Sequence, residues 1–228
     1  FKNKETFNDD IGDWDVSNVT DMYSMFMDAD NFNQDLTYWD VSSVTNMKWM
    51  FIRAYDFNGD ISTWDMSSVT NVTHMFKDAE SFNQDLSDWD VSSMTTMEAM
   101  FEVNDNFNMY SSIVNWDVSN VQSMRNMFYS AEHFNQDLSN WDASSVTDFT
   151  GMFSSANNLN DENKCAIHIA FSSNDAWPYD WSELCNFTDI TQDNIQAAVD
   201  LWVSDNAGAL TTYGEINTWD VSQIISMA

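Results

Sequence analysis

Hydrophobic and polar positions follow a pattern that repeats every 25 residues along the first two thirds of the chain. The tryptophans show the spacing most clearly, with steps of 25 residues and a single step of 27: Trp14, Trp39, Trp64, Trp89, Trp116 and Trp141. Two phenylalanine columns keep the same steps, one from Phe26 to Phe153 and one from Phe7 to Phe134, with Leu159 closing the second. A fixed period of this length predicts a repeat protein, in which each unit buries its apolar face only against its neighbours.

Within each unit the hydrophobic period changes, and the change predicts two kinds of local structure. The stretch 19–29 spaces its apolar residues three and four positions apart, which predicts one or two turns of helix. The stretch 36–41 is short and bounded by turn residues, which predicts a strand. Asp40 and Ser42 precede the next helical stretch, where their side chains can accept backbone N–H bonds. We therefore expect a solenoid with a short parallel strand and a short helix in each coil.

Units such as WDVSNVTDMYSMFMDADNFNQDL resemble the 25-residue repeat of mycoplasma surface lipoproteins, which is related to the leucine-rich repeats of bacterial surface proteins. The resemblance covers residues 1–160, about six coils. It implies a leucine-rich-repeat-like solenoid, a place on the cell surface or outside the cell, roles in adhesion or host contact, and no enzymatic activity.

The pattern stops near residue 160, and the segment that follows predicts a cap. Residues 161–187 hold the only proline and both cysteines of the chain, Cys165 and Cys185. In an oxidising compartment these two would form one disulfide, since neither has partners at a metal-binding spacing. A disulfide-closed segment over the last coil is expected because the ends of a solenoid expose its core.

Residues 188–212 predict a second, helical cap. The stretch 191–203 is amphipathic, with Thr191 as its predicted N-cap and Asn206 and Gly208 as its predicted stop. We interpret this helix as the kind of cap that opens a new array.

Residues 213–228 predict the start of a further coil, because Tyr213 and Trp219 occupy the slots of Phe7 and Trp14. Placed before the first residue, this end continues the repeat with about two residues missing. The phase match predicts an extended assembly, formed either by tandem copies in one chain or by separate copies stacked head to tail. The ends expected to meet carry eight apolar residues: Phe1, Phe7, Ile11, Trp14, Ile216, Trp219, Val221 and Met227.

Charge then narrows the choice of partners. The chain has 37 acidic and 7 basic residues, a net charge of −30, which repels nucleic acid and anionic membranes. No apolar stretch is long enough to span a membrane. The chain begins with Phe rather than Met and shows no signal peptide, which indicates a processed or partial chain. The expected partner is the protein itself, with cell-surface proteins or glycans as the alternative.

Two columns of aspartates run along the repeat, and one of them follows each tryptophan. The other contains Asp10, Asp35, Asp60, Asp85 and Asp137. Carboxylates about 5 Å apart repel one another, so something must offset the repulsion. The favoured interpretation is hydrogen bonding to backbone N–H groups in turns. The alternative is bridging of neighbouring coils by Ca²⁺, the one cofactor that the sequence suggests, although no known calcium-loop motif is present.

The remaining polar columns favour structure over chemistry. The asparagine column from Asn8 to Asn160 resembles the asparagine ladder of leucine-rich repeats, where side-chain amides satisfy backbone groups at a bend. The threonine column that starts at Thr20 is interpreted as capping the helical turns, with an ice-binding array as the weaker alternative. Three Asn-x-Thr sequences are candidate glycosylation sites: Asn18, Asn71 and Asn186. No carboxylate pair and no Cys–His pair is distinguished as catalytic, so we expect no enzyme.

These features favour an extracellular structural protein that forms a fibre or a cell-surface assembly by head-to-tail stacking. The alternative is a monomeric adhesin that binds a receptor or a glycan through its concave strand face or through the insertion loop at 108–112.

Overall fold

The computed structural model describes residues 1–107, 112–185, 191–213, 216, 219 and 221. The chain divides into two compact units, Phe1–Asp180 and Trp181–Ala228. Its helices are α1 (Asp161–Phe171), the 3-10 helix η1 (Ser182–Cys185), α2 (Ile195–Ser204) and α3 (Asn206–Tyr213). None of the described helices has the length and hydropathy needed to cross a membrane.

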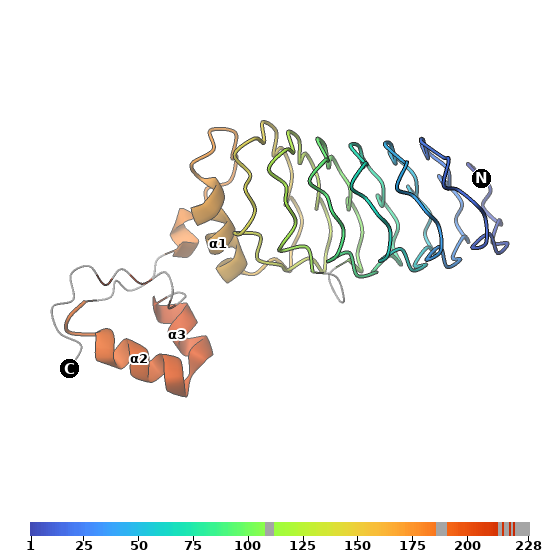
Figure 1. Cartoon of the computed structure of the whole chain (residues 1–228). Helices are drawn as coiled ribbons and strands as arrows, with labels where there is room; N and C mark the ends of the chain where they lie inside the picture. Colours follow the sequence, from blue (N-terminus) through green and yellow to red (C-terminus); the bar gives the residue numbers. More distant parts are fainter. Residues whose placement is uncertain (108–111, 186–190, 214–215, 217–218, 220, 222–228) are drawn as a thin grey trace. The chain divides into compact units, whose positions relative to one another are not determined.

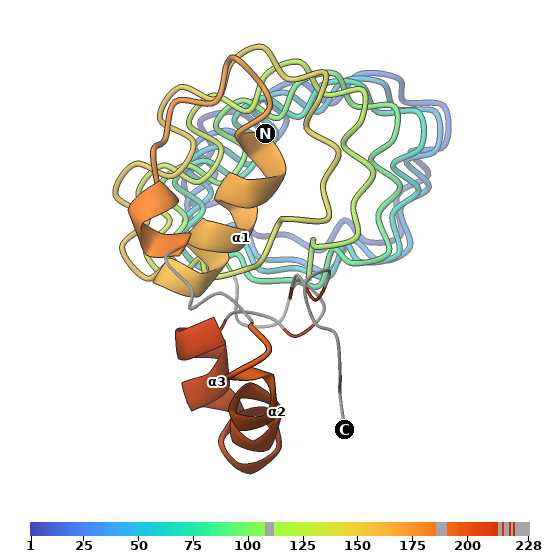
Figure 2. The same ribbon diagram turned by 90° about the vertical axis from the view of Figure 1, so that its left-hand side faces the viewer.

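The first unit is a stack of coils that runs from the N-terminus to α1 (Figure 1). Seen from the end turned toward the viewer in Figure 2, successive coils follow one another around the same path. We number coils 1 to 6 by the tryptophan that begins each of them: Trp14, Trp39, Trp64, Trp89, Trp116 and Trp141. Residues 1–13 are the second half of the coil that precedes coil 1.

Neighbouring coils are joined by backbone hydrogen bonds in the segment that follows each tryptophan. In coil 1 every second N–H donates to a carbonyl of coil 2, and the N···O distances are 2.9 Å for Met22 to Asn46, 3.0 Å for Ser24 to Lys48, 2.8 Å for Phe26 to Met50 and 3.0 Å for Asp28 to Ile52. Of the intervening N–H groups, Tyr23 donates to Asp21 Oδ1 at 2.8 Å, and Met25 and Met27 bond three residues back, as Met25 does to the carbonyl of Met22 at 3.2 Å. The segment is therefore a run of turns whose alternate N–H groups hold the next coil.

The helix and the strand predicted for each coil are both wrong. The described part of residues 1–160 contains no α-helix, and its β-structure is limited to isolated parallel bridges at Asp21, Asn46, Asn71, Thr96, Ser123 and Asp148. These bridges lie in the stretch predicted to be helical. The reason is the left-handed backbone at Ser24 and Asp28, both with φ of 56°, which interrupts a helix and turns N–H groups toward the next coil. In the predicted strand, the Trp39 N–H donates to Leu36 O at 3.0 Å and closes a turn instead.

The core consists of aromatic ladders, as the repeat predicted. Phe26, Phe51 and Phe76 are fully buried, and their ring centroids are 5.3 and 5.7 Å apart along the stack. Within one coil the rings of Phe26 and Phe32 stack at 4.0 Å. Each unit thus covers the apolar face of the next, which is why one unit could not fold alone.

Each interior tryptophan adds a hydrogen bond between coils. The Trp39 indole N–H donates to the carbonyl of Ile11, 28 residues earlier in the chain, at 3.0 Å. The same bond recurs in every later coil: Trp64 to Leu36, Trp89 to Ile61, Trp116 to Leu86 and Trp141 to Ile113. A buried indole N–H needs an acceptor, so this bond explains why tryptophan rather than phenylalanine holds the position.

Residues 161–180 cover the last coil. Helix α1 begins after Asn160, whose side chain accepts a hydrogen bond from the Asn163 N–H. Trp177 packs edge to face against Phe149, with ring centroids 5.2 Å apart. The Tyr179 hydroxyl accepts a hydrogen bond from the Phe153 N–H at 2.8 Å. Aromatic side chains therefore occupy the surface where a seventh coil would stack.

The second unit contains η1, α2 and α3, and α2 packs against α3. The predicted disulfide is confirmed, since Cys165 and Cys185 are both disulfide-bonded and are the only cysteines. The predicted helix begins at Ile195 rather than after Thr191, with Asn194 in the N-cap position. It ends at Ser204, before Asn206 as predicted, and a second helix that was not predicted, α3, starts at Asn206 after a break at Asp205.

Candidate functional site

The outward face of residues 1–25 differs from every interior layer of the stack. Trp14 is 48% exposed, whereas Trp39 in the same slot of the next coil is 3% exposed. Phe1 and Phe7 are only half-buried, although their counterparts Phe26 and Phe32 are completely buried. We call this surface, formed by residues 1–25, the end face.

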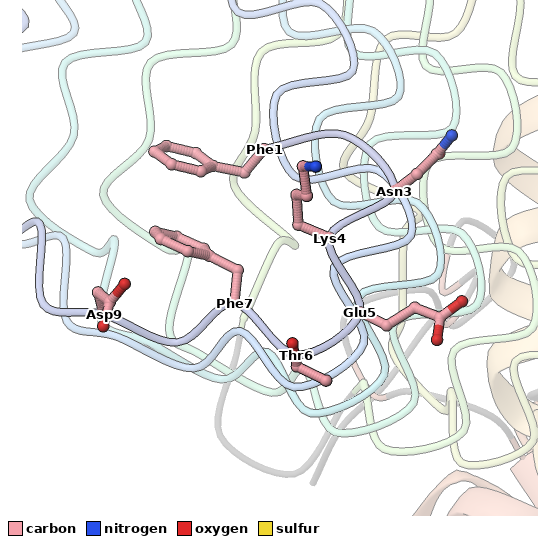
Figure 3. Close-up of a pocket in the computed structure, with 7 residues that line it drawn as sticks. All are labelled: Phe1, Asn3, Lys4, Glu5, Thr6, Phe7 and Asp9. Carbon is pink, nitrogen blue, oxygen red and sulfur yellow. The ribbon is translucent and has the colours of Figure 1, made fainter.

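Part of the end face is an open hollow of about 670 Å³. The rings of Phe1 and Phe7 lie parallel, with centroids 4.0 Å apart, and point the same way (Figure 3). Lys4, Glu5 and Asp9 add charged groups to the lining. The hollow is therefore lined by both apolar and charged groups.

The end face also carries hydrogen-bond donors that are paired in the interior. In the next coil the Thr45 N–H donates to Thr20 O at 3.0 Å, and the Asn33 N–H donates to Asn8 Oδ1 at 2.9 Å. Within the part of the chain that the structure describes, the equivalent N–H groups of Thr20 and Asn8 and the indole N–H of Trp14 have no protein acceptor. The end face thus offers the donors that a preceding coil would accept.

Most of the C-terminal residues that are predicted to pack on this face lie outside the described residues. Met227 is one of them. Of the described ones, Ile216 and Val221 are exposed, at 43% and 41%. Trp219 packs edge to face against Trp202, with centroids 6.0 Å apart, inside the second unit. Tyr213 is the last residue of α3. The further coil over 213–228 therefore stays a prediction.

The aspartate columns are accounted for by local turns, as favoured above. Asp35 Oδ1 accepts the Thr37 N–H at 2.9 Å, and Asp10, Asp60, Asp85 and Asp137 each accept the N–H two residues further on. In the second column, hydrogen bonds from the nearby serine hydroxyls hold the pKa values of four aspartates below the ordinary value: Asp15, Asp40, Asp90 and Asp142. Across the described residues, no three His, Cys, Asp or Glu side chains come together as a metal site. The geometry therefore gives the calcium hypothesis no ligand cluster.

The asparagine ladder is confirmed. The Oδ1 of each asparagine accepts the N–H of the asparagine one coil later, at 2.8 to 3.0 Å, in four successions: Asn8 to Asn33, Asn33 to Asn58, Asn58 to Asn83 and Asn135 to Asn160. Gln34 reinforces it, since its Nε2 donates to Asn8 Oδ1 at 2.7 Å. Because the side chain takes the place of a backbone acceptor, the chain can bend here without losing a hydrogen bond.

The threonine column does not cap a helix, and this prediction is wrong. The hydroxyl of Thr70 donates to the carbonyl of Thr45, one coil before, at 3.1 Å.

The glycosylation candidates differ from one another. Asn18 is exposed, Asn71 is half-buried and accepts the Thr73 N–H at 3.0 Å, and Asn186 lies outside the described residues. Of the insertion loop at 108–112, only Ser112 is described.

A cluster that sequence reasoning missed lies beside the coil-to-coil hydrogen bonds. Trp49 contacts the ring of Tyr23 at 5.5 Å, the ammonium of Lys48 at 5.1 Å and the ring of His74 at 6.3 Å. Burial lowers the pKa of His74, and burial raises the pKa of nearby Asp78. The signal was present in the sequence, since these positions differ from coil to coil.

Ion pairs join coils along the same segment. Arg53 Nη2 lies 2.9 Å from Asp28 Oδ2, and Lys77 Nζ lies 2.7 Å from Glu102 Oε1. Each pair links residues one coil apart. Arg53 and Lys77 are thus held in place by acidic residues of the neighbouring coil.

Stacked aromatic ladders, an asparagine ladder and hydrogen-bonded turns define a solenoid repeat protein. The chain belongs to the family described as "Mycoplasma protein of unknown function, DUF285", which it matches over residues 1–112 and again over residues 85–169. No curated protein and no solved structure matches the chain.

Proposed function

We propose that this protein is an extracellular structural repeat protein whose end face takes a further coil of the same repeat, so that copies continue head to tail into a fibre or surface assembly. The observation that carries the proposal is the exposed aromatic layer of the end face together with its unpaired donors. A coil of the same type would supply the carbonyl for Trp14 and the side-chain acceptor for the Asn8 N–H.

Magnitudes indicate which contacts such stacking needs. Full burial of one large apolar side chain contributes about 1.5–3 kcal/mol. Phe1, Phe7 and Trp14 are already partly buried, so covering them gives less than the full amount. Association of free molecules costs about 4–15 kcal/mol. The hydrogen-bond donors must therefore contribute as well, unless the covering coil belongs to the same polypeptide.

Two observations support the surface location and the relation to leucine-rich repeats. The disulfide between Cys165 and Cys185 fits an oxidising compartment. The asparagine ladder matches the arrangement expected from the resemblance to leucine-rich repeats of bacterial surface proteins. Adhesion remains the alternative role for a chain that stays monomeric.

Substitution of Trp14 tests the proposal. We expect the purified wild-type chain to form concentration-dependent polymers in light scattering and linear particles in electron microscopy. Trp14→Asp should abolish them because it puts a charge into the apolar layer. Tyr38→Asp is the matched control, since Tyr38 is an aromatic that is 84% exposed and lies outside the end face.

The length of the native polypeptide shows whether the covering coil belongs to the same chain or to another copy. A native polypeptide several times longer than this chain, with continuous coils, would identify a tandem protein. A native polypeptide of this length within fibres would identify separate copies. Wild-type chains that remain monomeric, together with native material that shows no continuous coils, would refute stacking and favour the adhesin.

A further inference from the structure

One segment of the repeat changes from coil to coil at several of its positions, next to the invariant Met-Phe pair. We call this surface the ladder face and define it as residues 23–29, 48–54, 73–79, 98–104, 125–131 and 150–156. In its second column no two coils carry the same residue: Ser24, Trp49, His74, Ala99, Asn126 and Gly151. Its fifth column is equally varied: Met27, Ile52, Lys77, Glu102, Tyr129 and Ser154. By contrast, every coil begins with Trp-Asp and has Met-Phe in the middle of the ladder face.

Variation of this kind has a physical consequence for recognition. A surface that is the same in every coil can slide by one coil against a partner and keep all its contacts. A surface that changes from coil to coil fits its partner in a single register. The ladder face is thus suited to one defined alignment, unlike the invariant faces of the solenoid.

The ladder face is also electrically unlike the rest of the chain. It carries four basic residues, Lys48, Arg53, Lys77 and Arg125, and four acidic ones, Asp28, Asp78, Glu98 and Glu102. Its net charge is therefore zero in a chain of net charge −30. Two copies that approach through other surfaces repel one another, whereas the ladder face adds no net charge at the contact.

The order of these charges along the stack has a further regularity. From coil 1 to coil 5 the net charges of the ladder face are −1, +2, 0, −2 and +1, and coil 6 is neutral. The series changes sign when it is reversed about coil 3. A twofold axis reverses the order of the coils in this way when it lies in the plane of the interface and is perpendicular to the solenoid axis.

We propose that the ladder face is a self-association surface through which two copies pair face to face, with antiparallel solenoid axes and a twofold axis at coil 3. In this arrangement coil 1 lies opposite coil 5 of the partner copy, and coil 2 lies opposite coil 4. Each column lies opposite itself. The net charges of facing coils are then opposite, and the contact is closed because the same patch is used by both copies.

Three pairs of positions agree with this register, whereas Arg53 lies opposite Val103 and Glu102 lies opposite Ile52. Lys48 lies opposite Glu98 of the partner copy, an oppositely charged pair in the same column. Trp49, the largest residue of its column, lies opposite Ala99, which has the smallest side chain there apart from glycine. Tyr23 lies opposite Arg125, a combination suited to a cation–π contact.

The structure holds these side chains ready for contact. Tyr23 and Tyr129 are 45% and 37% exposed, and Arg125 is exposed. Trp49 is held between Tyr23 and His74, so little side-chain freedom remains to be lost on binding. Well-packed tryptophan, tyrosine and arginine residues are the types that dominate protein interfaces.

Charge-reversal variants, studied alone and as mixtures, test the proposal. All chains are full-length and carry Trp14→Asp, so that stacking through the end face does not contribute. The parent should show a monomer–dimer equilibrium in sedimentation velocity. Lys48→Glu and Glu98→Lys should each weaken the dimer by about tenfold or more, because each places two like-charged pairs in the interface. Lys164→Glu and Glu162→Lys change the net charge equally on α1 and should leave the dimer unchanged.

Mixing the two variants distinguishes this register from any other. A Lys48→Glu chain and a Glu98→Lys chain form two oppositely charged pairs when they meet, so the mixture should dimerise as the parent does. Restoration supports the antiparallel pairing. A parent that stays monomeric at every concentration, a dimer insensitive to both reversals, or a mixture no better than the single variants would overturn it.

Discussion

At the residue scale the unusual feature is a left-handed backbone at residues other than glycine. Twelve such residues occur among those described, and all fall at two positions of the repeat. One position holds Ser24, Trp49, His74, Ala99 and Asn126, and the other holds Asn3, Asp28, Arg53, Asp78, Val103, Ser130 and Ser155. This conformation costs about 1–2 kcal/mol for an L-residue. The coil-to-coil bonds hold it, since the Val103 N–H donates to Tyr129 O at 2.8 Å.

Val103 is the most strained of these residues, because its side chain branches at Cβ and its φ is 53°. Val103→Asn should raise the free energy of unfolding by about 0.5–1 kcal/mol, since asparagine tolerates the left-handed region. Thermal unfolding measures the gain. Val114→Asn is the matched control, a half-buried valine without a left-handed φ, and should not stabilise the protein. Equal shifts in both variants would show that strain at Val103 is not the cause.

At the element scale the unit of stability is the contact between two coils rather than a helix or a strand. Phe51 stacks on Phe76 at 5.7 Å, and the Trp89 indole N–H donates to Ile61 O at 3.1 Å. Backbone, side-chain and aromatic ladders therefore run in parallel along the stack. Loss of one contact therefore destabilises the interface between two neighbouring coils, as expected for a repeat protein in which each unit contacts only its neighbours.

Trp89→Phe tests the role of the indole bond. The variant keeps an aromatic ring but removes one of the two donors to the Ile61 carbonyl, which still accepts the Trp64 N–H at 3.2 Å, so the free energy of unfolding should fall by about 0.5–1.5 kcal/mol. Trp14→Phe is the control, because the Trp14 indole N–H has no protein acceptor in the described structure and its loss should cost much less. Urea unfolding of both variants gives the comparison. Similar losses would assign the stabilisation to ring size instead.

At the scale of the whole molecule the outstanding property is the excess of negative charge. A net charge of −30 favours the expanded state through self-repulsion, and the two aspartate columns run along the stack. Their carboxylates accept hydrogen bonds from N–H groups in their own turns, and these bonds locally offset the repulsion between carboxylates. Screening by salt should supply the long-range part.

The melting temperature should therefore rise with ionic strength. Sodium chloride and calcium chloride should act equally at equal ionic strength, because the described residues form no metal-binding cluster. Differential scanning calorimetry with and without EDTA measures this. A larger rise with calcium that EDTA reverses would establish a bound ion, since a ligand that binds only the folded state stabilises it.

The period, the aromatic columns, the aspartate turns, the asparagine ladder and the disulfide could all be predicted from the sequence. Each depends on the spacing of chemically distinctive residues. Trp39 must stack on Trp64 once the period is 25, and Asp35 can reach the N–H of Thr37 in almost any turn. Local chemistry and self-similarity determine such features without knowledge of the path between them.

The tertiary structure alone decided the path of each coil. Apolar residues three and four positions apart fit one face of a helix, and they fit a run of turns equally well. Hydrogen bonds such as Ser24 N–H to Lys48 O select the turns, and they exist only when a second coil lies alongside. The same neighbours select the left-handed residues and the acceptors of the tryptophan indoles. Spacing within one unit carries no information on these features, because the partner that decides each of them lies one coil away.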